Sequence, residues 1–220
     1  MTILFAAALS DCVVMMADGR RAMSVAVRTD VAEKVLPLNA QVTLAVGGAQ
    51  AGTDYAAGIL RNGLPDSASG IERHLKLVTR LAVQHVMNQL TPEAIAQTSV
   101  DVALLVAGFD AEGAFIVGGA HSNRMAEPIA LNRQVSVLEG EQFVVWGGED
   151  SNAQAYFLKR LVVEVRRLGE QAGQRVPLIE AILLAGKKTI DHLSRRHPGI
   201  GGHMQFRVVF PDQEPITGFR

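Results

Sequence analysis

Apolar residues in the first third of the chain fall into short runs separated by polar breaks. Residues 3–9 and 12–17 are almost entirely apolar, Ser10 and Asp11 separate them, and the turn dipeptide Asp18-Gly19 closes the second run. Runs this short and continuous are typical of strands buried inside a sandwich. The pattern predicts further strands at 24–28, 34–38 and 42–46.

Helical periodicity follows these strands and returns in the second half of the chain. A first helix is expected from about residue 49 to 64, where Pro65 ends it. A short helix or turn begins at 91–93, and Asp150 or Ser151 can cap a later helix that extends to about 168. Another long helix is predicted over 176–196. The helix that follows Pro65 shows the clearest periodicity of all, with apolar residues at Ile71, Leu75, Val78, Ala82 and Val86.

The remaining apolar runs predict strands joined in pairs by short turns. They cover residues 100–107 with 114–119, 135–138 with 143–146, 204–210 and 215–219. Short connections imply antiparallel pairing, and the order is strands, two helices, strands, two helices, strand. We therefore predict an α+β fold, a four-layer α-β-β-α sandwich of two antiparallel sheets flanked by helix pairs. Because no linker divides the chain, we expect one domain over residues 1–220.

Composition and charge exclude several classes of protein. The 220 residues are 48% hydrophobic with a formal net charge of −1, which argues against a disordered chain and against broad electrostatic capture of nucleic acid. The single cysteine, Cys12, cannot form an intramolecular disulfide. The apolar run 3–9 is too short to span a membrane, and no basic residue precedes Arg20, as a signal peptide would require. We expect a cytoplasmic protein with no membrane segment.

Motifs for cofactors and metals do not fit this chain. The six histidines lack ligand spacing, so no metal site is predicted. The glycine-rich segment 47–52 precedes a helix, but Thr53 stands where a phosphate-binding loop needs lysine, so we expect no cofactor. Its backbone N–H groups could still hold a developing oxyanion at the helix N-terminus.

Thr2 is a candidate nucleophile. We expect aminopeptidases to remove Met1 because threonine is small, and this would give Thr2 a free α-amine. An α-amine titrates near ~7.7–8.0, so it can act as a general base for the hydroxyl of the same residue. Threonine after Met1 is also common in proteins without this chemistry, so the residue alone does not decide between the two interpretations.

The spacing of several motifs resembles proteasome β subunits and the simpler bacterial proteasome-type peptidases. In that family an aspartate follows the N-terminal threonine by 16 residues, a lysine by 32 and a glycine by 46, which corresponds here to Thr2, Asp18, Lys34 and Gly48. The likeness extends over nearly the whole chain. It is carried by Ala17-Asp18-Gly19-Arg20, Val31-Ala32-Glu33-Lys34-Val35, Leu44-Ala45-Val46-Gly47-Gly48-Ala49, Leu104-Leu105-Val106-Ala107-Gly108-Phe109-Asp110, Gly147-Gly148 and Gly199-Ile200-Gly201-Gly202.

The resemblance implies an N-terminal-nucleophile hydrolase with a distinct role for each of these residues. Thr2 would attack the peptide carbonyl, and the positive charge of Lys34 would favour the deprotonated forms of its hydroxyl and amine. Asp18 would keep Lys34 charged and oriented, and the N–H of Gly48 would stabilise the tetrahedral oxyanion.

The resemblance also implies a substrate pocket and partners. The pocket residues would be Val46, Ala32, Arg21 and Gln50, which suits a medium-sized apolar side chain before the scissile bond. Expected partners are further copies of the chain in stacked homo-oligomeric rings, and a peptide or unfolded protein as substrate. Whether an ATP-dependent unfoldase docks on such a ring stays open at this level.

Three positions depart from the family pattern. Gly148, His197 and Ile200 stand where proteasome β subunits usually have serine, aspartate and serine, which form hydrogen bonds around the threonine amine. Two functions therefore remain. The first is a threonine peptidase that acts through an acyl-enzyme, and the second is a weak or inactive ring subunit that serves as a scaffold or binding module.

Overall fold

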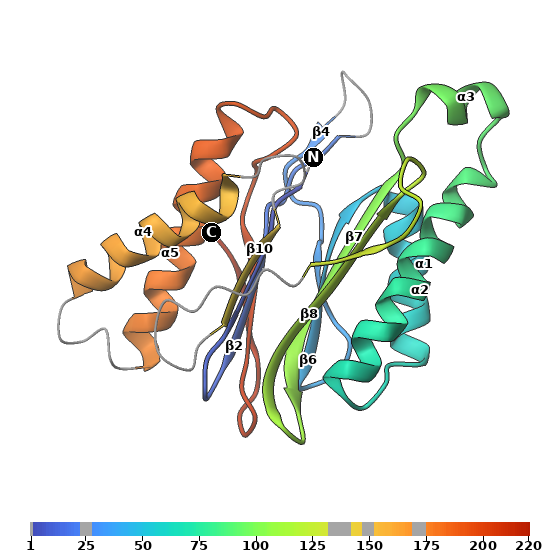
Figure 1. Ribbon diagram of the computed structural model, residues 1–220. Helices are drawn as coiled ribbons and strands as arrows, with labels where there is room; N and C mark the ends of the chain where they lie inside the picture. Colours follow the sequence, from blue (N-terminus) through green and yellow to red (C-terminus); the bar gives the residue numbers. More distant parts are fainter. Residues whose placement is uncertain (1, 23–27, 132–141, 147–151, 169–174) are drawn as a thin grey trace.

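Two antiparallel sheets of five strands each face one another at the centre of the computed structural model (Figure 1). The structure describes residues 2–22, 28–131, 142–146, 152–168 and 175–220. The first sheet has the order β10 (Gln142–Trp146), β1 (Leu4–Ala8), β2 (Val13–Ala17), β11 (Gln205–Val209), β12 (Ile216–Phe219). The second has the order β5 (Val35–Pro37), β6 (Val42–Gly48), β7 (Asp101–Asp110), β8 (Gly113–Ser122), β9 (Ile129–Ala130).

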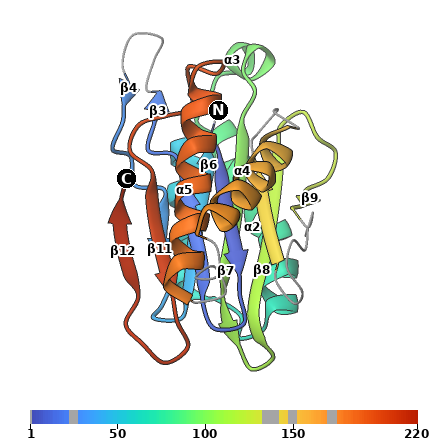
Figure 2. The same cartoon turned by 90° about the vertical axis from the view of Figure 1, so that its left-hand side faces the viewer.

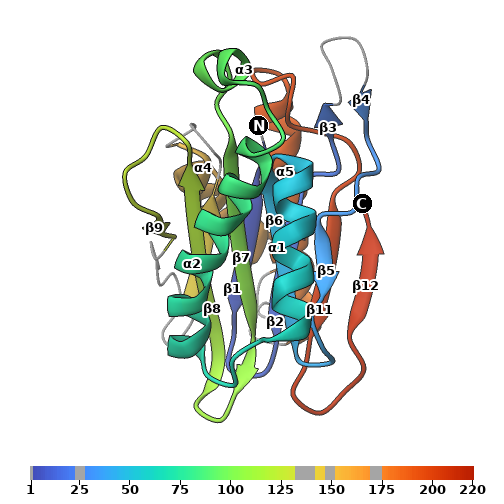
Figure 3. The same ribbon diagram turned by 90° about the vertical axis from the view of Figure 1, so that its right-hand side faces the viewer.

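Helices cover the outer face of each sheet, so the predicted α-β-β-α layering is confirmed. The helices over the first sheet are α4 (Ala153–Leu168) and α5 (Arg175–Ser194), which lie in front in Figure 2. The helices over the second sheet are α1 (Gln50–Asn62) and α2 (Ala68–Met87), which lie in front in Figure 3. A short helix, α3 (Pro92–Gln97), stands at one end of the sandwich near the N-terminus.

The layering explains why the first strands lack polar residues. Ile3, Phe5 and Ala7 face the helices α4 and α5, whereas Leu4 and Ala6 alternate with them and face the second sheet. Successive side chains of a strand point to opposite faces, so both faces of β1 are buried. The aromatic ring of Phe5 packs against Phe157 of α4 at 5.2 Å between centroids.

Some predicted elements change their limits in the structure. The hairpin of β7 and β8 extends to Asp110 and Gly113, because Asp110 accepts the N–H of Glu112 and Gly113 takes a φ of +125°. The strand expected at 24–28 lies outside the described residues apart from Arg28, which belongs to β4 (Arg28–Thr29) and pairs with β3 (Arg21–Ala22). The strand expected at 135–138 and the cap at Asp150 or Ser151 lie outside the described residues.

Caps and close contacts position the helices on the second sheet. The Ser67 side chain accepts the N–H of Gly70, and Asp110 in β7 accepts the N–H of Ala68, so the start of α2 is tied to the hairpin. Hydrogen bonds from the N–H groups lower the pKa of Asp110, the bond from Ala68 most of all.

In the described parts of the chain, no helix combines the length and hydropathy that a membrane span would need.

Candidate active site

The candidate residues come together because neighbouring antiparallel strands run in opposite directions. The start of one strand therefore lies beside the end of the next, at the same end of the sheet. Thr2 precedes β1, Asp18 follows β2, Lys34 precedes β5 and Gly48 ends β6. The two sheets present these positions at one end of the sandwich, close to the label N in Figure 1. Residues up to 46 positions apart in the sequence thus lie around one site.

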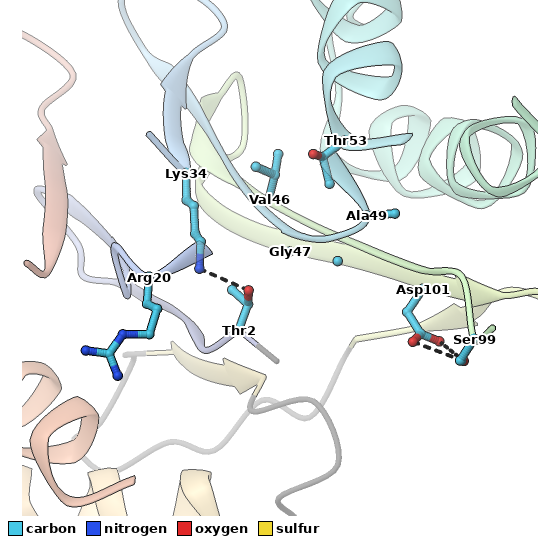
Figure 4. A pocket seen from close by; sticks show the side chains of 10 residues that line it. Thr2, Arg20, Lys34, Val46, Gly47, Ala49, Thr53, Ser99 and Asp101 are labelled. Atoms are coloured by element: carbon cyan, nitrogen blue, oxygen red, sulfur yellow. Dashed lines mark hydrogen bonds between the residues drawn. The ribbon is translucent and has the colours of Figure 1, made fainter. Parts of the chain in front are cut away.

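Thr2, Asp18 and Lys34 form a buried cluster. The ammonium group of Lys34 donates to the Thr2 hydroxyl at 3.0 Å (Figure 4) and to Asp18 Oδ1 at 3.0 Å. Thr2 is 7% exposed, Lys34 3% and Asp18 0%. The lysine therefore links the hydroxyl to the carboxylate in a water-poor setting, where a positive charge acts strongly on its neighbours.

Backbone donors hold the carboxylate of Asp18 in place. The N–H of Ile3, next to Thr2 in the chain, donates to Asp18 Oδ1 at 2.9 Å, and the N–H of Gly201 donates to Oδ2 at 3.2 Å. Burial raises the pKa of Asp18 above its ordinary value, whereas the charge of Lys34 and these N–H donors act to lower it.

The backbone of Lys34 is held between both sheets. Its carbonyl accepts the N–H of Val46 in β6 at 2.9 Å. Its own N–H donates to the side chain of Gln205 in β11 at 2.7 Å, and the N–H of Val35 donates to the same oxygen at 2.9 Å. Gln205 is 2% exposed, so this amide is a buried bridge between the sheets that orients the lysine.

Arg20 secures the loop that supplies the Gly201 donor. Its guanidinium pairs with Asp30, with Nε to Oδ1 at 2.7 Å, and donates to the carbonyls of Pro198 and Ile200 at 3.3 and 3.2 Å. Gly201 has a φ of +139°, and a Cβ there would lie 2.9 Å from Cζ of Arg20. The region near Gly199–Gly202 that carried the resemblance thus packs onto Asp18 and Arg20.

Glycine is required at position 48 for two reasons. Its φ is +103°, and a Cβ would lie 1.9 Å from the carbonyl oxygen of Asp101 in β7. Asp101 also accepts the N–H of Ala49 at 2.8 Å, which fixes the entry into α1. Gly47 is close to the nucleophile, because a Cβ there would lie 3.2 Å from Cγ2 of Thr2.

A cavity of about 230 Å³ opens over this cluster. Of the predicted pocket residues, Val46 lines it. Ala32 and Gln50 are not among its lining residues, since Ala32 is buried against Gly19 and Gln50 is exposed at the start of α1. The side chain of Arg21 lies outside the described residues. The residues around the cavity are Thr2, Arg20, Lys34, Val46, Gly47, Gly48, Ala49, Thr53, Ser99 and Asp101.

Six of these lining residues were not among the predicted site residues: Arg20, Gly47, Ala49, Thr53, Ser99 and Asp101. Arg20 belongs to the motif Ala17-Asp18-Gly19-Arg20 that carries the resemblance, so its position close to Asp18 in the sequence could have identified it as a site residue. Ser99 and Asp101 reach the site only through the pairing of β7 with β6, in which Gly48 lies opposite Val102. In Figure 4 Asp101 and Ser99 lie across the cavity from Lys34.

The positions that depart from the family pattern differ in what they offer the site. Ile200 is fully buried in the core beneath α4 and α5, so an aliphatic side chain fills the position where a serine was expected. The N–H of His197 donates to the carbonyl of Leu193 at 2.8 Å, which places His197 at the end of α5. Gly148 lies outside the described residues.

No group of three or more His, Cys, Asp or Glu residues with metal-binding geometry occurs within the described ranges.

Comparison with known families gives the same assignment as the geometry. No curated protein sequence matches the chain. The family described as "Proteasome subunit" matches residues 2–120, a segment that includes Thr2, Asp18, Lys34 and Gly48. With more than half of its residues covered by this match and with the four-layer sandwich that the family resemblance implies, the chain belongs to the proteasome subunit family.

Proposed function

We propose that the protein is a threonine-type endopeptidase of the bacterial proteasome-homologue class, which cleaves peptide bonds through an acyl-enzyme on Thr2. The observation that carries this proposal is the 3.0 Å hydrogen bond from the buried Lys34 ammonium to the Thr2 hydroxyl, with Asp18 on the same ammonium. A hydroxyl beside a buried cation loses its proton more readily, which is what a nucleophile at neutral pH needs.

In the acylation step, the Thr2 oxygen forms a bond to the carbonyl carbon of the substrate. Its proton passes to the Thr2 α-amine, which is free once Met1 has been removed, and the oxyanion accepts the N–H of Gly48. The carbon–nitrogen bond then breaks, and the leaving amine takes the proton from the α-ammonium. This leaves the acyl group as an ester on Thr2.

In the deacylation step, water attacks the ester carbon and gives its proton to the α-amine. The ester bond breaks, and the Thr2 oxygen regains a proton from the α-ammonium. Lys34 keeps its proton throughout and stabilises the negative charge that develops on the hydroxyl oxygen. Asp18 acts through Lys34, so it is a positioning residue.

We also propose that the chain works in a self-compartmentalised assembly of stacked homo-oligomeric rings in the cytoplasm. Membership of the proteasome subunit family supports self-association. Large apolar side chains on the outer helices offer surfaces for neighbouring copies, and Tyr55 of α1, Leu77 of α2 and Val163 of α4 are 39%, 51% and 45% exposed. Native mass spectrometry of the full chain should find a multiple of the subunit mass, and a monomer would contradict the ring.

A peptide epoxyketone tests the catalytic proposal, because the reagent must react with both the hydroxyl and the free amine of Thr2. Intact mass spectrometry should find a chain without Met1 that gains one label. Thr2→Ala should abolish the label, whereas Thr98→Ala, an exposed threonine at the end of α3, should retain it. A processed wild-type chain that stays unlabelled would contradict the peptidase.

The second function, a weak or inactive ring subunit that serves as a scaffold or binding module, is favoured by one observation. Ile200 is an aliphatic, fully buried residue where the family usually has a serine, so this position offers no hydroxyl to the Thr2 amine. An assembled ring without Met1 that fails to react with the epoxyketone is the outcome this function requires.

A further inference from the structure

A second cavity lies next to Thr2 and has no role in the chemistry described above. Its volume is about 390 Å³, within the range of about 300–1,000 Å³ that is usual for ligand pockets. It shares Thr2, Gly48 and Asp101 with the first cavity, so the two cavities meet at the nucleophile.

The wall of this cavity is largely apolar. Trp146 at the end of β10, Ala120 in β8, Met125 and Ile129 line it. The indole is close to the nucleophile, because a Cβ placed on Gly47 would lie 3.0 Å from Cζ3 of Trp146 and 3.2 Å from Cγ2 of Thr2. Ile129 is 48% exposed, so about half of its side chain is open to contact with a ligand.

The charges around the second cavity disfavour an anion. Asp101 is the one formally charged side chain among its described lining residues. His121 lies beside it, and burial lowers the pKa of this imidazole, as does the positive charge of Arg80. A neutral histidine and a carboxylate offer no positive charge to an acidic ligand, and the Lys34 ammonium behind Thr2 lines the first cavity and not the second.

A peptide bond under attack by Thr2 must extend away from the hydroxyl in two directions. Val46 and Lys34 belong to the first cavity, where the side chain before the scissile bond is expected. The chain that follows the scissile bond then needs space that also begins at Thr2 and Gly48, which the second cavity provides.

We propose that the second cavity is a specificity subsite that binds an uncharged apolar side chain of the residue that follows the scissile bond. Met125, Ile129 and Trp146 form its walls, and Asp101, which lines both cavities, rejects acidic residues. This inference rests on the proposed peptidase function for its catalytic meaning, but the binding of the leaving peptide can be measured without turnover.

The single tryptophan of the chain, Trp146, gives a direct readout of occupancy. In the Thr2→Ala variant, the tripeptide amide Leu-Gly-Gly should change the fluorescence of Trp146 on titration. The matching Asp-Gly-Gly amide should bind at least about tenfold more weakly, since it loses apolar burial and faces Asp101. Equal titration curves for the two peptides, or no change with either, would overturn the subsite.

Charged substitutions provide a matched pair of variants. Ile129→Glu should weaken Leu-Gly-Gly binding by about tenfold. Ile216→Glu changes an isoleucine of similar exposure, 54%, at the far edge of the first sheet and should leave binding unchanged. Equal losses in both variants would show a nonspecific effect and contradict the assignment.

Cleavage assays distinguish a failure of the subsite proposal from a failure of the peptidase proposal. Two quenched peptides that differ only in leucine or aspartate after the scissile bond should differ at least about tenfold in kcat/KM, and Ile129→Glu should lower kcat/KM for the leucine peptide about tenfold. Cleavage of both peptides at equal rates would overturn the subsite and leave the peptidase standing. Absence of cleavage and of epoxyketone labelling, with peptide-specific quenching of Trp146 retained, would overturn the peptidase and leave the binding site standing.

Discussion

Two buried carboxylates in this molecule bind lysine in different surroundings. Asp18 and its partner Lys34 are both buried, with side chains 0% and 3% exposed. Glu164 in α4 is also buried, at 1%, but its partners Arg167 and Lys188 are 58% and 47% exposed. The two clusters use similar residue types, so their difference lies in where the cation sits.

The location of the cation changes the electrostatic result. The hydrogen bond from Lys188 lowers the pKa of Glu164 more than any other cause, because its cations keep their contact with water while they stabilise the carboxylate. Burial dominates at Asp18 and raises its pKa, because the ion pair there has lost its water. The helix cluster is organised for stability, and the cluster at Thr2 keeps a cation beside a hydroxyl at the expense of stability.

Replacement of the buried lysine should have the largest effect. Lys34→Met leaves the Asp18 carboxylate buried without its ion pair, so unfolding by urea near pH 7 should show a loss of about 3–5 kcal/mol. Epoxyketone labelling should slow at least about a hundredfold. Lys188→Met, the matched change in the helix cluster, should lose no more than about 1 kcal/mol because Glu164 keeps Arg167.

The same variant has a predicted pH dependence. A carboxyl whose folded-state pKa is raised contributes stability below its unfolded pKa and loses it as the pH rises through the folded value. Since burial already raises the pKa of Asp18, and Lys34→Met removes a group that lowers it, the deficit should shrink on acidification below neutral pH. A deficit that stays constant or grows as the pH falls would contradict this account of Asp18.

Removal of both partners of the buried pair should restore stability. In the double variant with Asp18→Asn and Lys34→Met no uncompensated charge remains, so most of the 3–5 kcal/mol lost by Lys34→Met, on the order of 2–4 kcal/mol, should return. Labelling should stay as slow as in Lys34→Met, because the cation beside Thr2 is gone. Urea unfolding and intact mass together check the result, and a double variant as unstable as Lys34→Met would show that charge is not the cause.

Removal of the helix carboxylate should have a smaller effect, and its deficit should persist to a lower pH than that of Lys34→Met. Glu164→Gln should cost about 1–2 kcal/mol near neutral pH and leave labelling unchanged. The folded-state pKa of Glu164 is lowered, so its contribution is present above the ordinary value of 4.5 and is lost as the pH falls through the folded value. The deficit of the variant should therefore disappear in strong acid, and a slower labelling rate would show that the two clusters are coupled.

The smallest change tests the site without altering any charge. Gly47→Ala places a methyl group 3.0 Å from Cζ3 of Trp146 and 3.2 Å from Cγ2 of Thr2, so the neighbours must shift by a few tenths of an ångström. Stability should change by no more than about 0.5 kcal/mol while labelling slows a few-fold, on the order of 1 kcal/mol in activation free energy. Gly58→Ala in α1 meets no atom within 4 Å and should keep the full labelling rate.

The difference between the two clusters also shows which contacts could be predicted from the sequence and which could not. The resemblance to proteasome subunits selected Asp18 and Lys34, and the antiparallel strand order explains how these two residues meet at one end of the sheets. The role of Glu164 had no sequence signal, because Lys188 approaches it from α5, 24 residues away, and only helix packing defines that contact. The same holds for the Gln205 bridge and for Asp101, which depend on pairing between distant strands.

The sequence by itself determined most of the described elements and their antiparallel layers, and its resemblance to proteasome subunits selected Thr2, Asp18, Lys34 and Gly48. Apolar periodicity and turn residues are local, and they act over the few residues that one strand or helix contains. Tertiary structure alone decided which side chains line the cavity: Val46 does, whereas Ala32 and Gln50 do not. It also decided that a second, apolar cavity opens beside Thr2. Cavities form between elements, so their walls depend on packing, which no single segment of sequence specifies.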